Sequence, residues 1–386
     1  MINKQLNQIT VEDLNNLIQN AIPERKTIEY KRSLPENSDS AKKEFLADIS
    51  SFANASGGDM IFGLEENNGV PTSLSGLTID DTDAEILKLE NIIRDGIEPR
   101  VTAAVQTINL PNDKVIFIFR TNKSWLGPHR VIYKGHDKFY SRNSAGKYPL
   151  DTIELRTAFN LSQTLVDKML KFRVDRITKL YANETPIPSF PEGPKVVLHI
   201  IPFESFSSNI NLDLSTIMQD ARKLPPMFSH NWTPKINFEG VVTYSNSEKS
   251  YVQMYRNGIV EAVDNGMLDP VQPGRHEIPG QGYEKRVIAS LRTYLQTLRD
   301  FGINPPFAIF LTLTGIKGYK MGISVRPALD YGHVVDRDIL QLPEKIIESF
   351  NIRSEDILRS LFDLVWNCCG FEKSPNFDEQ GNFIST

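Results

Sequence analysis

Apolar and charged residues alternate between positions 27 and 32. Ile28 and Tyr30 would point to one side and Glu29 and Lys31 to the other, because successive side chains of a strand face opposite ways. The segment is therefore predicted to be a strand with one face in the core and one charged face.

Apolar residues at helical spacing predict three helices around this strand. The first begins at Thr10, the second is capped by Ser40 and ends at Gly57-Gly58, and the third opens with a capping box from Thr82 to Glu85. Short apolar or alternating runs predict further strands at residues 60–64, 115–119 and 138–142. This order of elements predicts a mixed α/β domain.

The second half of the chain begins after a long predicted helix that starts at Asp151 and ends near Asn183. Four prolines then crowd residues 186–194, which predicts a linker because proline cannot continue a helix or a central strand. Asn257-Gly258 separates two apolar runs and predicts a β-hairpin. The overall fold class is predicted to be α+β, divided into a domain over 1–150, a connecting helix over 151–185, the proline-rich linker over 186–194, and a C-terminal α+β domain of unknown role over 195–386.

The composition narrows the class of protein. The chain has 386 residues, 40% hydrophobic and 24% charged, with a net charge of −5, so any nucleic-acid surface must be a local patch on an acidic protein. Cys368 and Cys369 are adjacent and cannot form a disulfide framework. The polar N-terminus and the absence of a run of about 18 apolar residues predict a cytoplasmic protein without a membrane segment.

Three segments of the first domain carry the candidate chemistry. They are ERKTIEYK (residues 24–31), FANASGGDMIFGLEE (52–66), and PH (128–129) followed by FYSRNS (139–144). Together they resemble the Schlafen AlbA-type, or divergent Alba-like, domain over residues 20–150. The hallmarks of that family are a Glu-x4-Glu-aromatic-Lys strand, a helix ending Ala-Phe-Ala-Asn-x-x-Gly-Gly, and a strand ending Gly-Val-Asp-Asp.

The residues themselves suggest a group of carboxylates. Glu29 lies on the charged face of its strand, Glu24 is expected in the turn after Pro23, and Glu65 and Glu66 end the next strand. If these strands are neighbours, the acids converge and repel one another unless a cation lies between them. Mg²⁺ and Mn²⁺ prefer such oxygen ligands, and a metal held in this way supports phosphodiester hydrolysis.

The resemblance implies a metal-dependent ribonuclease acting on transfer RNA through three acidic residues. Carried over by position, these are Glu24, Glu29 and Glu66, but Glu65-Glu66 replaces the family's Asp-Asp, so either of the two could be the third ligand. Lys31 and Arg32 are candidates to contact the scissile phosphate. Each acid also has a purely structural explanation. Glu24 could be a surface acid, Glu65 and Glu66 could belong to a solvated turn, and Glu29 could form a structural ion pair with Lys31 or Arg32.

A basic segment follows in the same domain and is a candidate for RNA binding. Basic residues outnumber acids from position 123 to 147, and aromatic residues between them could stack on unpaired bases. Lysines on an edge hairpin, which discourage aggregation, are the alternative. The candidate nucleic-acid-binding residues are Arg32, Arg130, Lys134, Lys138, Arg142 and Lys147. His129, Asn54 and His199 are expected to have structural roles.

Two other functions remain open. One is a non-catalytic regulator that binds DNA or RNA, and the other is an effector whose C-terminal domain senses a nucleotide or another ligand. No Gly-x4-Gly-Lys-Ser/Thr loop is present. The resemblance further implies a homodimer, because relatives with two Alba-like lobes clamp RNA between them, and an antiviral defence role in a bacterium or phage.

Overall fold

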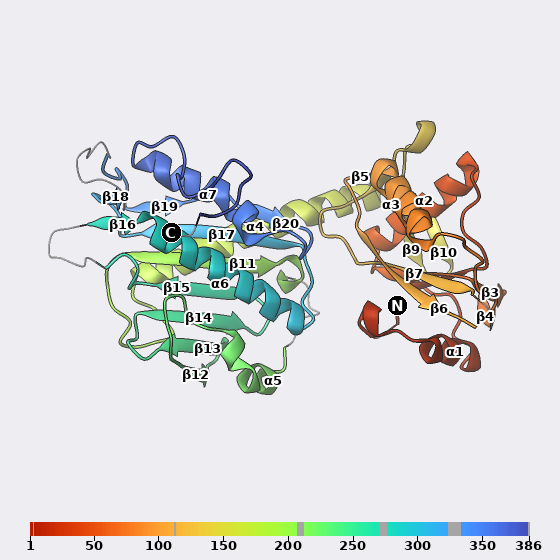
Figure 1. The fold of residues 1–386 in the computed structure, drawn as a ribbon, viewed down its shortest axis with the longest axis horizontal. Coiled ribbons are helices and arrows are strands. Elements are labelled where there is room, and N and C mark those ends of the chain that lie inside the picture. Colours follow the sequence, from red (N-terminus) through yellow and green to blue (C-terminus); the bar gives the residue numbers. More distant parts are fainter. Residues whose placement is uncertain (3, 112, 207–211, 270–275, 323–332, 385–386) are drawn as a thin grey trace. The chain divides into compact units, whose positions relative to one another are not determined.

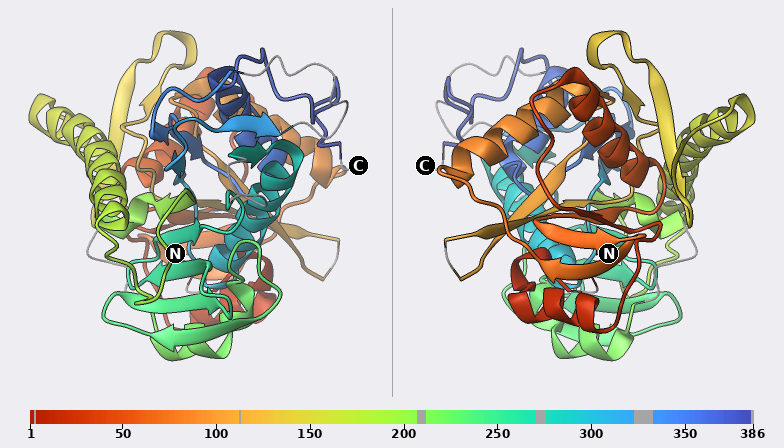
Figure 2. Two further views of the ribbon diagram at one scale, coloured as in Figure 1. Left: turned by 90° about the vertical axis from the view of Figure 1, so that its left-hand side faces the viewer. Right: turned by 90° about the vertical axis from the view of Figure 1, so that its right-hand side faces the viewer.

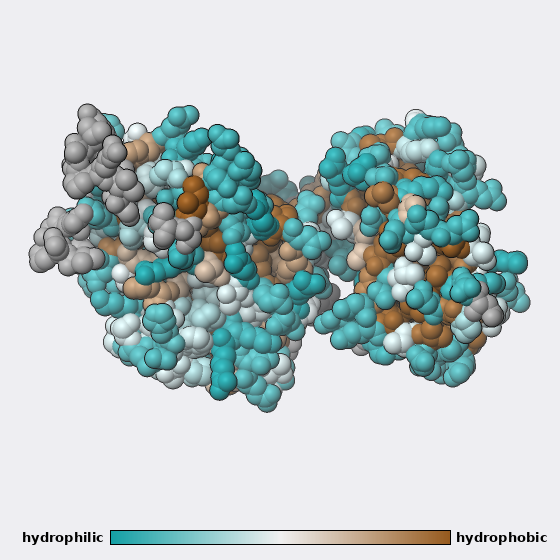
Figure 3. All heavy atoms as spheres, viewed as in Figure 1, coloured by the Kyte–Doolittle hydropathy of each residue, from teal (hydrophilic) through white to brown (hydrophobic). Residues whose placement is uncertain are grey.

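The computed structural model describes all residues except 3, 112, 207–211, 270–275, 323–332 and 385–386 (Figure 1). The chain forms two compact units, Met1–Thr164 and Leu165–Thr386. Both units combine helices with β-sheets, so the predicted α+β class is confirmed. The surface visible in Figure 3 is mainly hydrophilic. No helix in the described part of the chain is long and apolar enough to cross a membrane.

The main sheet of the first unit has four strands in the order β1-β2-β7-β6. Strands β1 and β2 are parallel, with a helix as the crossover between them, and the other pairs are antiparallel. Figure 2 (right) shows α1 on one side of these strands and α2 and α3 on the other. The elements are α1 (Val11–Gln19), β1 (Ile28–Lys31), α2 (Asp39–Asn54), β2 (Gly58–Phe62), α3 (Thr82–Gly96), β6 (Ala103–Asn109) and β7 (Val115–Thr121).

Alternate residues of β1 face opposite sides of the main sheet, as its sequence pattern predicts. Ile28 and Tyr30 pack with Leu14 of α1 in one apolar core. Phe45 and Phe52 of α2 pack against the other face, where they contact residues of β2, β7 and α3. The charged side of β1 is therefore turned toward α2.

Two smaller sheets complete the first unit. One has the order β10-β9-β8-β5, and its β9–β10 hairpin packs on α2. The other is the β3–β4 hairpin, which turns at Asn68 and Gly69, both at positive φ. The strands are β3 (Leu64–Asn67), β4 (Val70–Leu74), β5 (Ile97–Glu98), β8 (Arg130–Val131), β9 (Lys138–Asn143) and β10 (Gly146–Pro149).

The second unit is built on an eight-stranded sheet in the order β12-β13-β14-β15-β11-β17-β19, with β20 also paired to β17. Asn257-Gly258 joins β14 to β15 in the antiparallel hairpin that the sequence predicts. The strands are β11 (Lys195–Pro202), β12 (Trp232–Ile236), β13 (Gly240–Ser245), β14 (Ser250–Tyr255), β15 (Val260–Asp264), β17 (Phe307–Thr314), β19 (Ile339–Gln341) and β20 (Lys345–Ile347). A parallel pair, β16 (Glu277–Pro279) and β18 (Lys320–Gly322), lies apart from it.

Helices cover both faces of this sheet. The larger core joins one face to α6 and α7, and α6 crosses in front of the strands in Figure 1. The other face packs against the C-terminal part of α4, through Ile177 and Leu180. The helices are α4 (Thr152–Tyr181), α5 (Leu214–Gln219), α6 (Gly280–Asp300) and α7 (Ser354–Cys368), with short 3-10 helices at Leu6–Gln8, Tyr133–Gly135, Phe203–Phe206 and Ala221–Lys223.

The proline-rich stretch is not a linker. Ile187 and Phe190 are buried against Tyr251 and Val263 of the second unit's sheet, so the stretch belongs to that unit's core. The boundary between the units lies instead within α4, after Thr164. Proline excludes regular structure but does not prevent a segment from packing its apolar residues.

Two predicted helix caps are each displaced toward the N-terminus. The side chain of Ser38, rather than Ser40, accepts the N–H of Ala41 at the start of α2. Asp81, rather than Thr82, caps α3 through the N–H of Ala84. Adjacent Ser, Thr and Asp residues can all accept such a bond, so the sequence does not decide between them.

Candidate active site

Glu24, Glu65 and Glu66 line one pocket of about 380 Å³ in the first unit. Lys31 and Arg32, at the end of β1, line the same pocket. Two segments far apart in the sequence therefore bring three of the four candidate acids to one cavity, together with the two cations that were expected to contact phosphate.

Glu24 is fixed by the backbone on both sides of its turn. Its N–H donates to the carbonyl of Gly69 at 2.6 Å. Its Oε1 accepts the N–H of Tyr30 at 2.9 Å. The turn after Pro23 thus folds Glu24 back over β1 and ties it to the tip of the β3–β4 hairpin, as the sequence argument requires.

A β-bulge places Glu65 and Glu66 on the same pocket. Adjacent strand residues ordinarily point to opposite faces, but the register of β3 shifts between these two residues. Glu65 forms an ion pair with Arg32, Nε to Oε1 3.2 Å. Glu66 accepts the N–H of Gly69.

Glu29 is the fourth candidate acid and is 9% exposed. Its carboxylate is bound between two cations: Oε1 accepts from Lys31 Nζ at 2.7 Å, and Oε2 pairs with Arg142 of β9. The ion pair that the sequence offered as a structural alternative is therefore formed with Lys31.

Asp48 of α2 is a further acid of this region that the sequence argument did not include. It is 1% exposed and pairs with Arg142 Nη1 at 3.1 Å and Lys147 Nζ at 2.9 Å. Its Oδ2 has no hydrogen-bond partner among the described residues. Asp48 falls within the predicted apolar stripe of α2, three residues after Phe45, and an acid in such a stripe was the available signal.

The pKa of Glu24 reports the proximity of the acids. Burial raises this pKa, and the negative charges of Glu29 and Glu66 raise it further, against the opposing effects of the Tyr30 N–H and of Lys31. Burial also disfavours the ionised form of Glu29, but Arg142 and Lys31 outweigh it and hold the pKa of Glu29 below its ordinary value.

The pKa of Lys31 is affected by three acids of this group. Burial lowers the pKa of its ammonium, but Glu29, Asp48 and Glu24 together raise it above the ordinary lysine value. For Asp48, burial dominates and raises the pKa, although the ammonium of Lys147 acts against it. Lys31 therefore interacts electrostatically with all three acids, while Arg142 acts most strongly on Glu29 and Lys147 on Asp48.

The suitability of these residues for a divalent metal can be judged from the donors. Glu24 and Glu66 offer carboxylate oxygens to the pocket, and oxygen ligands of this kind suit Mg²⁺ or Mn²⁺. Glu29 is already engaged by Lys31 and Arg142. No group of three His, Cys, Asp or Glu side chains among the described residues is arranged to hold a metal ion. The residues fit the metal in chemical type, because Glu24 and Glu66 form no ion pair with any residue that the structure describes.

The predicted nucleic-acid-binding residues divide into two groups. Arg142 is only 3% exposed and is bound to Glu29 and Asp48, so its prediction as a surface contact was wrong: alternation on β9 turns it inward. Lys147 is directed to Glu44 and Asp48. The remaining candidates are at least partly exposed. Three of them form ion pairs with acids: Arg130 with Glu98 and Asp137, Lys134 with Asp39, and Arg32 with Glu65. The fourth, Lys138, is exposed on β9.

Asn54 and His129 hold the backbone, as expected. The amide of Asn54 donates to the carbonyls of His129 and Tyr140, both at 2.8 Å, and accepts the His129 N–H at 2.7 Å. His129 is 1% exposed, its Nδ1 lies 2.7 Å from Pro99 O, and burial lowers its pKa. These residues join α2 to β9, the strand that carries Arg142.

The model of the Schlafen AlbA_2 family matches residues 24–151. The chain contains a Schlafen AlbA_2 domain. The match agrees with the resemblance over residues 20–150 and confirms it. The matched residues include the whole candidate site, from Glu24 to Lys147, and the match indicates a nucleic-acid-related function.

Two solved structures show more distant similarity. A protein of Corynebacterium diphtheriae is 14% identical, with 36% of this chain and 26% of that chain covered and a TM-score of 0.25. The N-terminal domain of a putative ATP-dependent DNA helicase RecG-related protein from Nitrosomonas europaea is 20% identical, with 28% and 71% covered and a TM-score of 0.22. The match thus spans about a quarter of the Corynebacterium protein. No curated protein matches the chain.

Proposed function

We propose that this protein is an endoribonuclease that cleaves transfer RNA or another structured RNA at the pocket lined by Glu24, Glu65 and Glu66. The observation that supports this most directly is the convergence of these acids with Lys31 and Arg32 in one cavity of a Schlafen AlbA_2 domain. A protein that only binds nucleic acid has no need of crowded carboxylates beside its cations.

Each residue has a role that follows from its surroundings. Arg32, which is largely exposed, and Lys31 would hold the phosphate of the RNA backbone. Glu29 is a positioning residue, because it fixes the ammonium of Lys31 at 2.7 Å. Glu24 would act as a metal ligand, because its carboxylate faces the pocket and is held in place by the N–H of Tyr30.

A divalent cation is part of the proposal. Glu24 and Glu66 would hold Mg²⁺ or Mn²⁺, with Glu65 as the alternative to Glu66 and Glu29 beside them. The ion would supply positive charge to the phosphoryl group. Exposed Lys134 and Lys138, with the partly exposed Arg130, would extend the RNA-binding surface. The protein would act as a homodimer whose second copy provides the other lobe. The role in antiviral defence rests on family membership alone.

The test is RNA cleavage by matched glutamine variants. Purified wild type, Glu24→Gln and Glu66→Gln are incubated with total transfer RNA in Mn²⁺, Mg²⁺ or EDTA. We expect each variant to lose activity by about 100-fold or more, the scale for removing one transition-state interaction. Glu65→Gln decides which of the adjacent acids matters. Glu90→Gln, an exposed glutamate of α3, is the control and keeps full activity.

Melting temperatures of the variants distinguish lost chemistry from lost folding. Undiminished cleavage by both Glu24→Gln and Glu66→Gln would refute the proposed site, and cleavage in EDTA would refute the metal. Mass measurement in solution that finds only monomer would refute the dimer.

A second candidate function has its own support. Lys31, Arg142 and Lys147 already neutralise Glu29 and Asp48, which is the arrangement of a stable binding module rather than an open catalytic centre. If the protein is a non-catalytic binder, it will retain transfer RNA in a filter assay, and Glu24→Gln will bind as the wild type does.

A further inference from the structure

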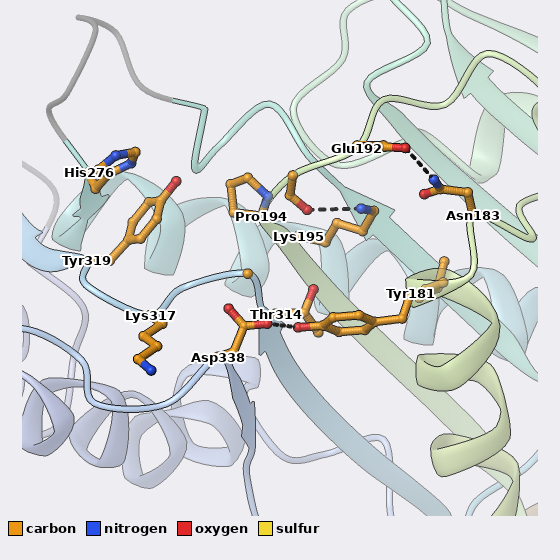
Figure 4. Close-up of a pocket in the computed structure, with 13 residues that line it drawn as sticks. Tyr181, Asn183, Glu192, Pro194, Lys195, His276, Thr314, Lys317, Tyr319 and Asp338 are labelled. Carbon is orange, nitrogen blue, oxygen red and sulfur yellow. Dashed lines mark hydrogen bonds between the residues drawn. The ribbon is translucent and has the colours of Figure 1, made fainter.

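A second pocket, of about 480 Å³, lies in the C-terminal unit and is separate from the site above. It is formed by the end of α4, the segment that leads into β11, and the loop after β17 (Figure 4). Its size is within the range of small-molecule sites in proteins. The residues that give it chemical character are Tyr181, Glu192, Lys195, Lys317, Tyr319 and Asp338.

The decisive feature is Lys195, which lines the pocket although it is 5% exposed. Its Nζ donates to Gly193 O at 2.9 Å, the one hydrogen bond found for this ammonium among the described residues. An ammonium has three N–H donors, so a buried one with a single acceptor has unmet hydrogen-bonding capacity. Burial lowers its pKa, and Glu192 only partly opposes this.

The acids of the pocket are occupied by neutral donors. Asp338 accepts the hydroxyl of Tyr181, and Glu192 Oε1 accepts from Asn183 Nδ2 at 2.8 Å. Figure 4 shows both contacts with Lys195 between them. Neither acid forms an ion pair with Lys195 or Lys317 in the described structure, so the cations are available to an anion from outside.

Other lining groups suit a larger ligand than a bare ion. Lys317 is exposed in the loop after β17. The rings of His276 and Tyr319 lie 5.1 Å apart at the pocket wall and offer an aromatic surface. Inorganic phosphate would occupy only a small part of 480 Å³.

We infer that this pocket binds a phosphorylated small molecule of mononucleotide size, with its phosphate at Lys195 and Lys317. Its hydroxyl groups would donate to the carboxylates of Asp338 and Glu192, and its ring would lie near His276 and Tyr319. Two cations, two carboxylates and two aromatic rings line the pocket, and they match in kind the phosphate, the hydroxyl groups and the ring of a nucleotide. The inference does not depend on the proposed ribonuclease activity.

The experiment is calorimetric titration of the full chain with adenosine, guanosine, cytidine and uridine monophosphates and triphosphates, and with inorganic phosphate. We expect at least one nucleotide to bind with a Kd below about 1 mM, in the range of weak specific binding. Lys317→Gln should weaken it by about tenfold, and Lys195→Met should abolish it. Lys235→Gln, an exposed lysine of β12, is the matched control and should bind as the wild type does.

Each result decides the inference. Failure of every nucleotide to bind overturns it, and so does equal affinity of the Lys317→Gln and Lys235→Gln variants. Phosphate that binds as tightly as any nucleotide overturns the assigned ligand size. Because Lys195 is buried, a melting curve accompanies its variant, and the exposed Lys317 carries the test if Lys195→Met unfolds. Glu24→Gln should bind the nucleotide normally, so loss of cleavage and loss of this site are distinguishable.

Discussion

Each unit buries carboxylates against cations, but the two clusters differ in their access to a pocket. In the second unit, Glu261 is 0% exposed and accepts two bonds from Arg176, at 2.7 and 2.8 Å, with further bonds from His199 Nε2 at 3.0 Å and the Tyr251 hydroxyl at 2.9 Å. In the first unit, Glu29 is bound by Lys31, whose side chain also lines the pocket.

The completeness of hydrogen bonding also differs. Both oxygens of Glu261 are used, and although burial opposes its ionisation, Arg176 and His199 hold its pKa well below the ordinary value. Asp48 has one unpartnered oxygen, and burial raises its pKa. Burial and charge pairing alone therefore do not identify a functional site. Incomplete pairing, in a cluster whose lysine also lines a pocket, is the more informative combination.

The largest effect is expected from breaking the cluster of the second unit. Arg176→Met leaves Glu261 buried without its main partner, which should cost about 3–5 kcal/mol of unfolding free energy. The measurement is urea denaturation followed by tryptophan fluorescence. The double variant Arg176→Met/Glu261→Gln removes both charges and should recover much of the loss. Equal stability of the single variant and the wild type would show that the pair is not a stabilising element.

A buried acid that has no cation partner among the described residues, Glu284, should give the next largest effect, through pH. Glu284 accepts from Trp366 Nε1 at 2.7 Å, Asn376 Nδ2 at 2.8 Å and Ser374 Oγ at 3.0 Å, and burial raises its pKa to about 7 from an ordinary 4.5. The folded chain therefore holds a proton that the unfolded chain releases. Its contribution is complete below about pH 4.5 and is lost as the pH rises through 7.

The expected change over this pH window is about 3 kcal/mol of unfolding free energy. Urea midpoints measured between pH 5 and pH 8 should fall with rising pH. Glu284→Gln, which keeps the shape and cannot ionise, should flatten the profile. A wild-type profile that rises across the same window would contradict the assignment.

The smallest change in stability is expected at the site of the first unit. Asp48→Asn should cost about 1 kcal/mol, because the raised pKa of Asp48 makes its neutral form less costly than that of Glu261. RNA cleavage should fall by about tenfold, since Asp48 binds Arg142, and Arg142 in turn pairs with Glu29, the partner of Lys31. A shift in the pH profile of cleavage, with the melting temperature preserved, would separate this positioning role from a purely structural one.

Local patterns in the sequence predicted much of the fold. The alternation at residues 27–32 gave β1 and the side on which Glu29 lies, and Asn257-Gly258 gave the β14–β15 hairpin. The prediction of a linker at the proline-rich stretch was wrong, because its apolar residues Ile187 and Phe190 are buried in the core of the second unit. Such burial depends on contacts distant in sequence, which no local pattern reports.

The candidate site was predictable in part. The motif located Glu24 and Glu66, and the structure brings both to one pocket. The bulge between Glu65 and Glu66 was not predictable, because a one-residue register shift depends on the partner strand. The burial of Arg142 was missed for a related reason: its partner Asp48 lies on a helix 94 residues away along the chain.

One residue of the hairpin tip, Gly69, sets the spacing of two acids in the pocket. The carbonyl of Gly69 receives the N–H of Glu24, while its own N–H is donated to the carboxylate of Glu66. Its φ of +75° favours glycine there. The spacing of the two acids is therefore inherited from the length of one tight turn. Any insertion between Asn67 and Gly69 would change the spacing of these two acids, whereas the cations of β1 would keep their places.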